Sequence, residues 1–123
     1  MGSVKTSAGC FAVMTRPVWK KKHKHSGHAL GLCGIKTPSN LGAIIRNAHA
    51  FGVIEIYLIG ECCDPFHPEC IRAAAGNISH IPLYSIKSIN TLSHYTFWKV
   101  DINASITIHD VPEAKNICFL LGS

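Results

Sequence analysis

The sequence has few charged residues and no long apolar run. Charged side chains make up 15% of the 123 residues and apolar ones 47%, a balance that favours a globular fold over a disordered chain. No stretch approaches the ~20 consecutive apolar residues of a membrane span, and the first residues lack the apolar core of an export signal. We therefore expect one domain without a membrane-spanning segment, located in the cytoplasm.

Acidic residues are absent from the first 28 positions, which carry six lysines or arginines. Residues 29–123 carry six basic and seven acidic side chains, so the net charge of +5 comes from the N-terminal segment. We predict a basic segment over 1–28 and a globular domain over 29–123. Cations beside an aromatic ring can bind phosphates and stack on a base. This pattern favours contacts with a nucleic acid such as RNA at Arg16, Trp19, Lys20, Lys21, Lys22 and Lys24. The alternative is a solvated tail or a localisation signal.

The six cysteines do not follow a familiar metal-binding pattern. Cys33 and Cys118 fall in predicted buried strands, and without an export signal we expect all six thiols to be reduced. A zinc site at Cys62, Cys63, His67 and Cys70 would use good ligands, but adjacent cysteines followed by two prolines match no usual ligand spacing. We predict no metal site.

Apolar runs alternate with helical patterns from residue 29 onward. The predicted strands are 29–35, 53–60, 81–86, 97–102 and 116–121, with a short additional strand at 10–14. The predicted helices are 39–51, 68–76 and 88–95. This alternation predicts an α/β fold with a parallel sheet and helices on both faces.

The helix over 39–51 has a distinctive pattern. Ser39 or Asn40 is expected to cap it and Gly52 to end it. Arg46 points away from the apolar side, and Gly42, one turn earlier, should leave open space beside the guanidinium. The expected buried stripe is Leu41, Ile44, Ile45, Ala48 and Phe51. The exposed face therefore predicts a site for an anionic or polar ligand.

Three segments carry a family resemblance. Residues 40–48 (NLGAIIRNA) resemble the first motif of the SpoU/TrmH branch of the SPOUT RNA methyltransferases. Residues 71–83 (IRAAAGNISHIPL) are similar to the segment after that family's second strand, and 117–123 (ICFLLGS) to the opening of its second motif. The resemblance covers about 29–123. It implies the front part of an α/β-knot methyltransferase domain, with the knot and most of the cofactor pocket missing.

The resemblance also implies an activity for the complete protein: S-adenosylmethionine-dependent methylation of a ribose 2′-hydroxyl in tRNA or rRNA, by a homodimer. Arg46 would orient a phosphate and stabilise charge on the 2′-oxygen, with Asn40 beside it as a second catalytic residue or only a helix cap. The implied cofactor-binding residues are Val100, Asp101, Ile102, Leu121 and Gly122. The chain alone is expected to be inactive. The alternatives are a non-catalytic RNA-binding protein and an inactive fragment.

Overall fold

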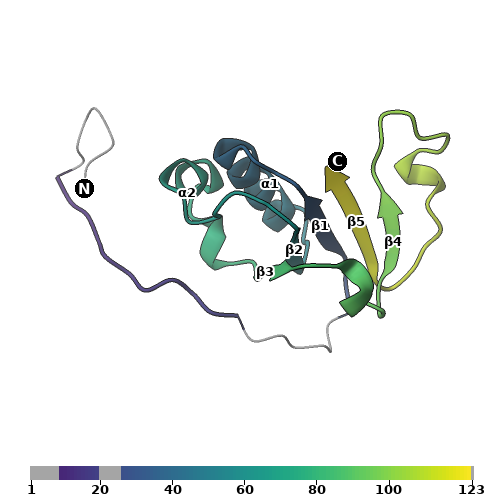
Figure 1. Cartoon of the computed structure of the whole chain (residues 1–123), viewed down its shortest axis with the longest axis horizontal. Helices are drawn as coiled ribbons and strands as arrows, with labels where there is room; N and C mark the ends of the chain where they lie inside the picture. The colour runs from purple at the N-terminus through teal and green to yellow at the C-terminus, as the bar shows by residue number, and fades with distance from the viewer. Residues whose placement is uncertain (1–8, 20–25, 123) are drawn as a thin grey trace.

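A parallel sheet forms the centre of the molecule. The computed structural model describes residues 9–19 and 26–122. The strands are β1 (Ala29–Cys33), β2 (Glu55–Ile59), β3 (Leu83–Ile86), β4 (Thr96–Lys99) and β5 (Ile117–Gly122), in the order β3-β2-β1-β5-β4 (Figure 1). Every strand pair is parallel, so the predicted parallel α/β sheet is confirmed. β1 lies in the middle, between β2 and β5.

Two α-helices lie side by side on one face of the sheet (Figure 1). α1 (Pro38–Ala50) follows β1, and α2 (Pro68–Ala74) follows β2. They touch at Gly42, where an added Cβ would lie 2.3 Å from the carbonyl oxygen of Cys70. Gly42 therefore faces α2 and is buried, and the open space expected between it and Arg46 does not exist. The core under the helices includes Leu32, Leu41, Ile45, Ile56 and Leu58.

The opposite face of the sheet carries a buried carboxylate. Glu55 is 7% exposed and accepts hydrogen bonds from the hydroxyls of Tyr57 (2.6 Å) and Tyr95 (2.5 Å). Burial, followed by the hydrogen bond to this carboxylate, raises the pKa of both phenols. Leu92 and Cys118 complete the apolar packing around this cluster. The buried Glu55 side chain thus has two hydrogen-bond donors.

The segment predicted to cover this second face of the sheet as a helix has a different structure. The helix expected at 88–95 is wrong: only a short 3-10 helix, η2 (Ile89–Thr91), forms there. The Ser88 hydroxyl accepts from the Asn90 amide at 3.3 Å, and such side chain–backbone turns compete with helical hydrogen bonding. Further 3-10 helices are η1 (Asn77–Ser79) and η3 (Ile108–Asp110). In the described residues, both α-helices lie on the Leu32 face.

The ends of α1 were predicted only in part. Its N-cap is Thr37 with Pro38 in the first turn, so the expected caps Ser39 and Asn40 are both inside the helix. Gly52 follows the helix with φ +74°, as predicted. Phe51 is 87% exposed because it comes after the last helical turn, and its assignment to the buried stripe is wrong.

The N-terminal part that the structure describes has no strand at 10–14, contrary to the prediction. Phe11, Val13 and Met14 are all more than 70% exposed. Within residues 9–19 and 26–122, no helix has the length and apolar character needed to cross a membrane.

Candidate functional site

Two loops meet at the carboxyl ends of β1 and β2. The amide of Cys63, after β2, donates to the carbonyl of Ile35, after β1, at 2.8 Å. Lys36 and Glu61 form an ion pair of 3.1 Å between the same loops. Open parallel sheets bind ligands beyond the carboxyl ends of their strands. The geometry therefore makes this edge the candidate site.

A cavity of about 440 Å³ opens at this edge, within the usual range for small-molecule sites. Gly122 forms part of its wall with φ +105°, and a Cβ there would lie 2.0 Å from the carbonyl oxygen of Cys33. Only glycine permits so close an approach of β5 to β1. The cavity is lined by Cys33, Gly34, Ile35, Lys36, Thr37, Asn40, Ala43, Ile44 and Gly122.

Both predicted catalytic residues lie on α1, at different distances from this cavity. Asn40 and Ala43 line it, and Arg46 follows Ala43 by one helical turn. The Arg46 side chain is exposed and has no hydrogen bond or ion pair with any other described residue. Its guanidinium is thus available to an anion next to the cavity.

The predicted cofactor-binding residues are divided between several places. Gly122 lines the 440 Å³ cavity, whereas Val100 and Asp101 line a separate cavity of about 160 Å³ beside β4. Leu121 packs against the core under α1. Ile102 is 99% exposed and lines neither cavity. The five residues therefore share the carboxyl edge of β4 and β5 without forming one pocket.

Asp101 already has partners at that edge. Its carboxylate accepts from the amide of Asn103 at 3.0 Å and pairs with Lys99 at 3.0 Å. The backbone hydrogen bond, followed by Lys99, lowers the pKa of the carboxyl. Asp101 is therefore ionised near neutral pH.

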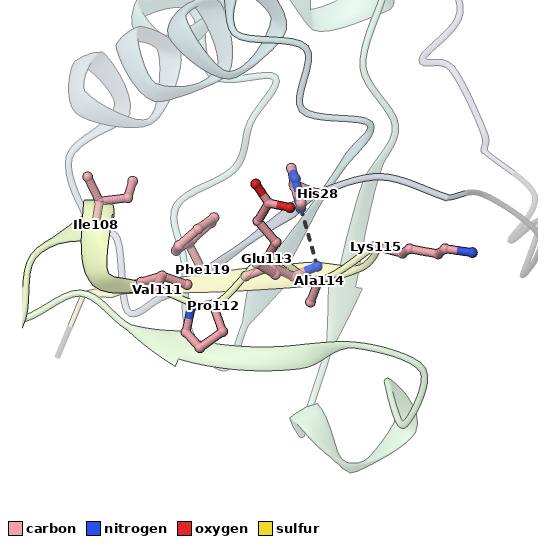
Figure 2. Close-up of a pocket in the computed structure, with 9 residues that line it drawn as sticks. His28, Ile108, Val111, Pro112, Glu113, Ala114, Lys115 and Phe119 are labelled. Carbon is pink, nitrogen blue, oxygen red and sulfur yellow. Dashed lines mark hydrogen bonds between the residues drawn. The ribbon is translucent and has the colours of Figure 1, made fainter.

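A larger cavity of about 580 Å³ lies along the loop before β5 (Figure 2) and shares Ile108, Val111 and Phe119 with the 160 Å³ cavity. It includes His28, whose Nδ1 accepts from the amide of Ile117 at the start of β5 (3.4 Å). The His28 imidazole meets the ring of Phe119 edge-on, with centroids 6.5 Å apart. Because it lies beside the amino-terminal half of β5, this cavity is not the candidate site.

Thiol chemistry and metal binding find little support in the geometry. Burial, followed by Cys62, raises the pKa of Cys33 in the cavity wall, so its thiol stays protonated near neutral pH. Cys62 donates its thiol to the carbonyl of Leu32 at 3.3 Å, and buried Cys70 has a pKa raised to about 11. Among the described residues, no three His, Cys, Asp or Glu side chains gather as a metal site.

The N-terminal segment contacts the loop after β2. Arg16 pairs with Asp64 at 3.0 Å, and its guanidinium carbon lies 4.9 Å from the centre of the Phe66 ring. Trp19 stacks on the same Phe66, with centroids 6.4 Å apart and planes at 17°. Two of the predicted RNA-contacting residues are therefore brought together. The other four, Lys20, Lys21, Lys22 and Lys24, lie outside the described residues.

Sequence reasoning did not identify Lys36, Thr37, Asp64 or Phe66 as part of this region. The available signal was positional, because all four follow the predicted strands 29–35 and 53–60 and so belong to the carboxyl edge. The contact of Phe66 with Trp19 joins positions 47 residues apart in the sequence, and no local pattern indicates it.

A parallel sheet with a cavity beyond the carboxyl ends of its central strands is the arrangement in which open α/β domains bind their ligands. Residues 27–123 match the model of the SpoU rRNA Methylase family. The chain belongs to this family, as its motifs predicted.

The relatives and similar structures agree on this family. The chain is 33% identical over 93 residues to an uncharacterized tRNA/rRNA methyltransferase of Synechocystis sp.. This match covers 75% of the chain and 34% of the relative. The chain is 32% identical over 90 residues to a 23S rRNA (guanosine-2′-O-)-methyltransferase of Vibrio parahaemolyticus, covering 70% of the chain and 36% of the relative. An AdoMet-bound rRNA methyltransferase from Sinorhizobium meliloti superposes with a TM-score of 0.74 at 27% identity, covering 82% of the chain and 41% of that structure. The chain thus spans about a third of these two curated relatives.

Proposed function

We propose that the protein carrying this chain is an S-adenosylmethionine-dependent RNA methyltransferase that modifies a ribose 2′-hydroxyl of tRNA or rRNA. The observation that carries the proposal is Arg46, exposed and without a described partner, one turn beyond the cavity at the carboxyl edge. Membership of the SpoU rRNA Methylase family supports the reaction class. The Vibrio parahaemolyticus relative is named as a guanosine-2′-O-methyltransferase, which supports the target atom.

S-Adenosylmethionine would supply an electrophilic methyl group at this edge. We propose that Gly122 and Leu121 at the end of β5, with Val100, Asp101 and Ile102 after β4, hold it. Their proximity supports this, because the Val100 amide donates to the carbonyl of Leu120 at 2.8 Å. Val100 and Ile102 have exposed apolar side chains, which would contact the adenine ring of the cofactor. The ionised Asp101 would bind one of the cofactor's hydroxyl groups or its ammonium group.

Arg46 would act as a fixed charge. A guanidinium is a poor general base because it holds its proton at neutral pH. Instead it would bind an RNA phosphate and stabilise negative charge that develops on the 2′-oxygen. The phosphate held there could accept the hydroxyl proton. Asn40, in the cavity wall, would orient the same nucleotide with its amide.

The proposal also covers RNA binding, oligomeric state and cellular location. RNA binding would use the basic segment, where Arg16 and Trp19 meet the β2–α2 loop. The complete protein would be a homodimer. All six cysteines are free, which supports a reducing compartment, the cytoplasm.

Replacing Arg46 tests the proposal. In a version of the protein that carries the C-terminal part of its relatives, Arg46→Ala should reduce methyl transfer to RNA by at least ~100-fold, the effect of losing a transition-state contact. The matched control is Asn47→Ala, an exposed neighbour on the same helix, which should keep activity. Transfer is measured with radiolabelled cofactor, and the 2′-O position by resistance of the adjacent linkage to alkali. Activity retained in Arg46→Ala rejects the role of this residue.

Cofactor binding distinguishes the alternative. A non-catalytic RNA-binding protein would bind RNA through the same basic segment but would not bind S-adenosylmethionine, even in the extended version. Methyl transfer without alkali resistance would point to a methylated base instead of the ribose.

A further inference from the structure

Trp19, Phe66 and Arg16 form a single stack of planar groups on the surface. Trp19 and Phe66 are nearly parallel at 17°, and the Arg16 guanidinium lies over Phe66. Trp19 is half-buried and also packs against apolar residues of both sheet faces. The N-terminal segment is therefore anchored at this point.

The stack lies close to the candidate site. Phe66 belongs to the β2–α2 loop, and the earlier part of that loop is joined to the cavity-lining loop by the Cys63–Ile35 hydrogen bond and the Lys36–Glu61 ion pair. The stack thus stands at the same carboxyl edge of the sheet as the cavity.

The ion pair that holds Arg16 is exposed. The Arg16 and Asp64 side chains are 65% and 47% exposed, and exposed pairs of this kind are weak. A phosphate offers the same two-oxygen geometry as a carboxylate, and arginine binds it in a bidentate manner. A phosphate can therefore compete with Asp64 for Arg16, while Asp64 keeps its other hydrogen bond, from the amide of Phe66 at 2.9 Å.

We propose that Trp19 and Phe66 form a stacking site for one unpaired base of the RNA, with Arg16 exchanging Asp64 for the neighbouring phosphate. This inference rests on the proposed function for its ligand. Aromatic rings bind bases of any sequence by stacking. The six cations and absent acids of residues 1–28 favour a nucleic acid over a neutral or basic peptide.

Fluorescence of Trp19 tests the contact directly. The sequence has two tryptophans, so Trp98→Phe leaves Trp19 as the single reporter. A single-stranded RNA oligonucleotide should quench Trp19 emission, and the same oligonucleotide with abasic positions should not. The abasic strand keeps its phosphates, so the difference isolates base stacking.

Affinity in the otherwise native chain gives a second measure that does not depend on Trp98→Phe. Trp19→Ala should weaken binding of single-stranded RNA by about 5- to 150-fold, the measured range for one stacked base. The matched control is Phe11→Ala, an aromatic on the same segment that is 78% exposed, and it should stay within about twofold of the native chain.

Equal binding of intact and abasic RNA, or equal affinities of Trp19→Ala and Phe11→Ala, would overturn the stacking site, as would a chain that binds no RNA. These outcomes are separate from the methyltransferase test. Base-dependent quenching of Trp19, together with no methyl transfer by the extended version of the protein, would support the stacking site and count against the enzyme. Methyl transfer by the extended version, with Trp19 emission unchanged by RNA, would support the enzyme and overturn the stacking site.

Discussion

Gly42→Ala should destabilise the protein, although alanine is the better helix former. The substitution gains up to ~1 kcal/mol of helix propensity. The added Cβ, however, would lie 2.3 Å from the Cys70 carbonyl oxygen, 2.7 Å from the Ala73 Cβ and 2.9 Å from the Ala74 nitrogen. Two of these are backbone atoms of α2, so a rotamer change cannot relieve the contact and the helices must separate. Overpacking of this kind costs ~1–3 kcal/mol.

Because the shortest contact is with a backbone atom, the cost should lie at the upper end of this range. The net loss should then be about 1–2 kcal/mol, or a Tm lower by roughly 4–8 °C for a chain of 123 residues. Urea unfolding followed by circular dichroism measures it. Asn47→Ala is the control, because it places alanine on the exposed side of the same helix and should change stability by no more than ~0.5 kcal/mol. If Gly42→Ala is as stable as the native chain, the close contact of α1 with α2 described above is wrong.

Three further predictions concern pH, salt and cofactor. Folding raises the pKa of Tyr57 and Tyr95, so the two phenols should not lower the free energy of unfolding below pH ~10, where exposed tyrosine titrates. Above that pH the free energy of unfolding should fall by up to ~1.4 kcal/mol per pH unit for each phenol. Tyr95→Phe should make this fall shallower in urea titrations at pH ~10 to ~11, and an unchanged slope would contradict the assignment. Deleting residues 1–28 removes six cations and should flatten the salt dependence of RNA binding, because each phosphate contact adds ~0.7–0.9 to the log–log slope. The same slope in both proteins would show that the segment does not contact the RNA. In calorimetry the 123-residue chain should bind S-adenosylmethionine no more tightly than ~100 μM, about −5.5 kcal/mol, because Val100 and Ile102 are 53% and 99% exposed; tighter specific binding would show that the pocket is already complete.

Local patterns predicted the elements best where packing and periodicity agree. The runs that became β1 and β2 are apolar on both faces, and Leu41, Ile45 and Ala48 recur at helical spacing and are buried. The helix α1 starts one residue earlier than predicted, because the fixed φ of Pro38 suits the first turn and Thr37 becomes the N-cap. The helical pattern at 88–95 misled because Leu92 and Tyr95 are both buried at a spacing that a turn can also produce.

The rest depends on contacts that are distant in sequence. Glu55 looked like one polar residue in an apolar strand, and its partner Tyr95 lies 40 positions away. The order of strands and the meeting of Trp19 with Phe66 are likewise long-range. In the candidate site, the motif identified Asn40 and Arg46. Lys36 and Thr37 belong to no motif, and only the position of the cavity at the carboxyl edge shows that they line it.

The strand order also has a consequence for how the chain reaches this structure. β1 pairs with β2 at Ala29–Glu55, but with β5 only at Ala29–Cys118, across a loop more than three times longer, whose closure costs more entropy. On a ribosome, β1, α1, β2, α2 and β3 can associate while β5 is still unsynthesised. The central strand then keeps one unpaired edge until β5 inserts. Since Gly122 and Cys33 both line the cavity of the candidate site, that cavity forms only when β5 has paired with β1.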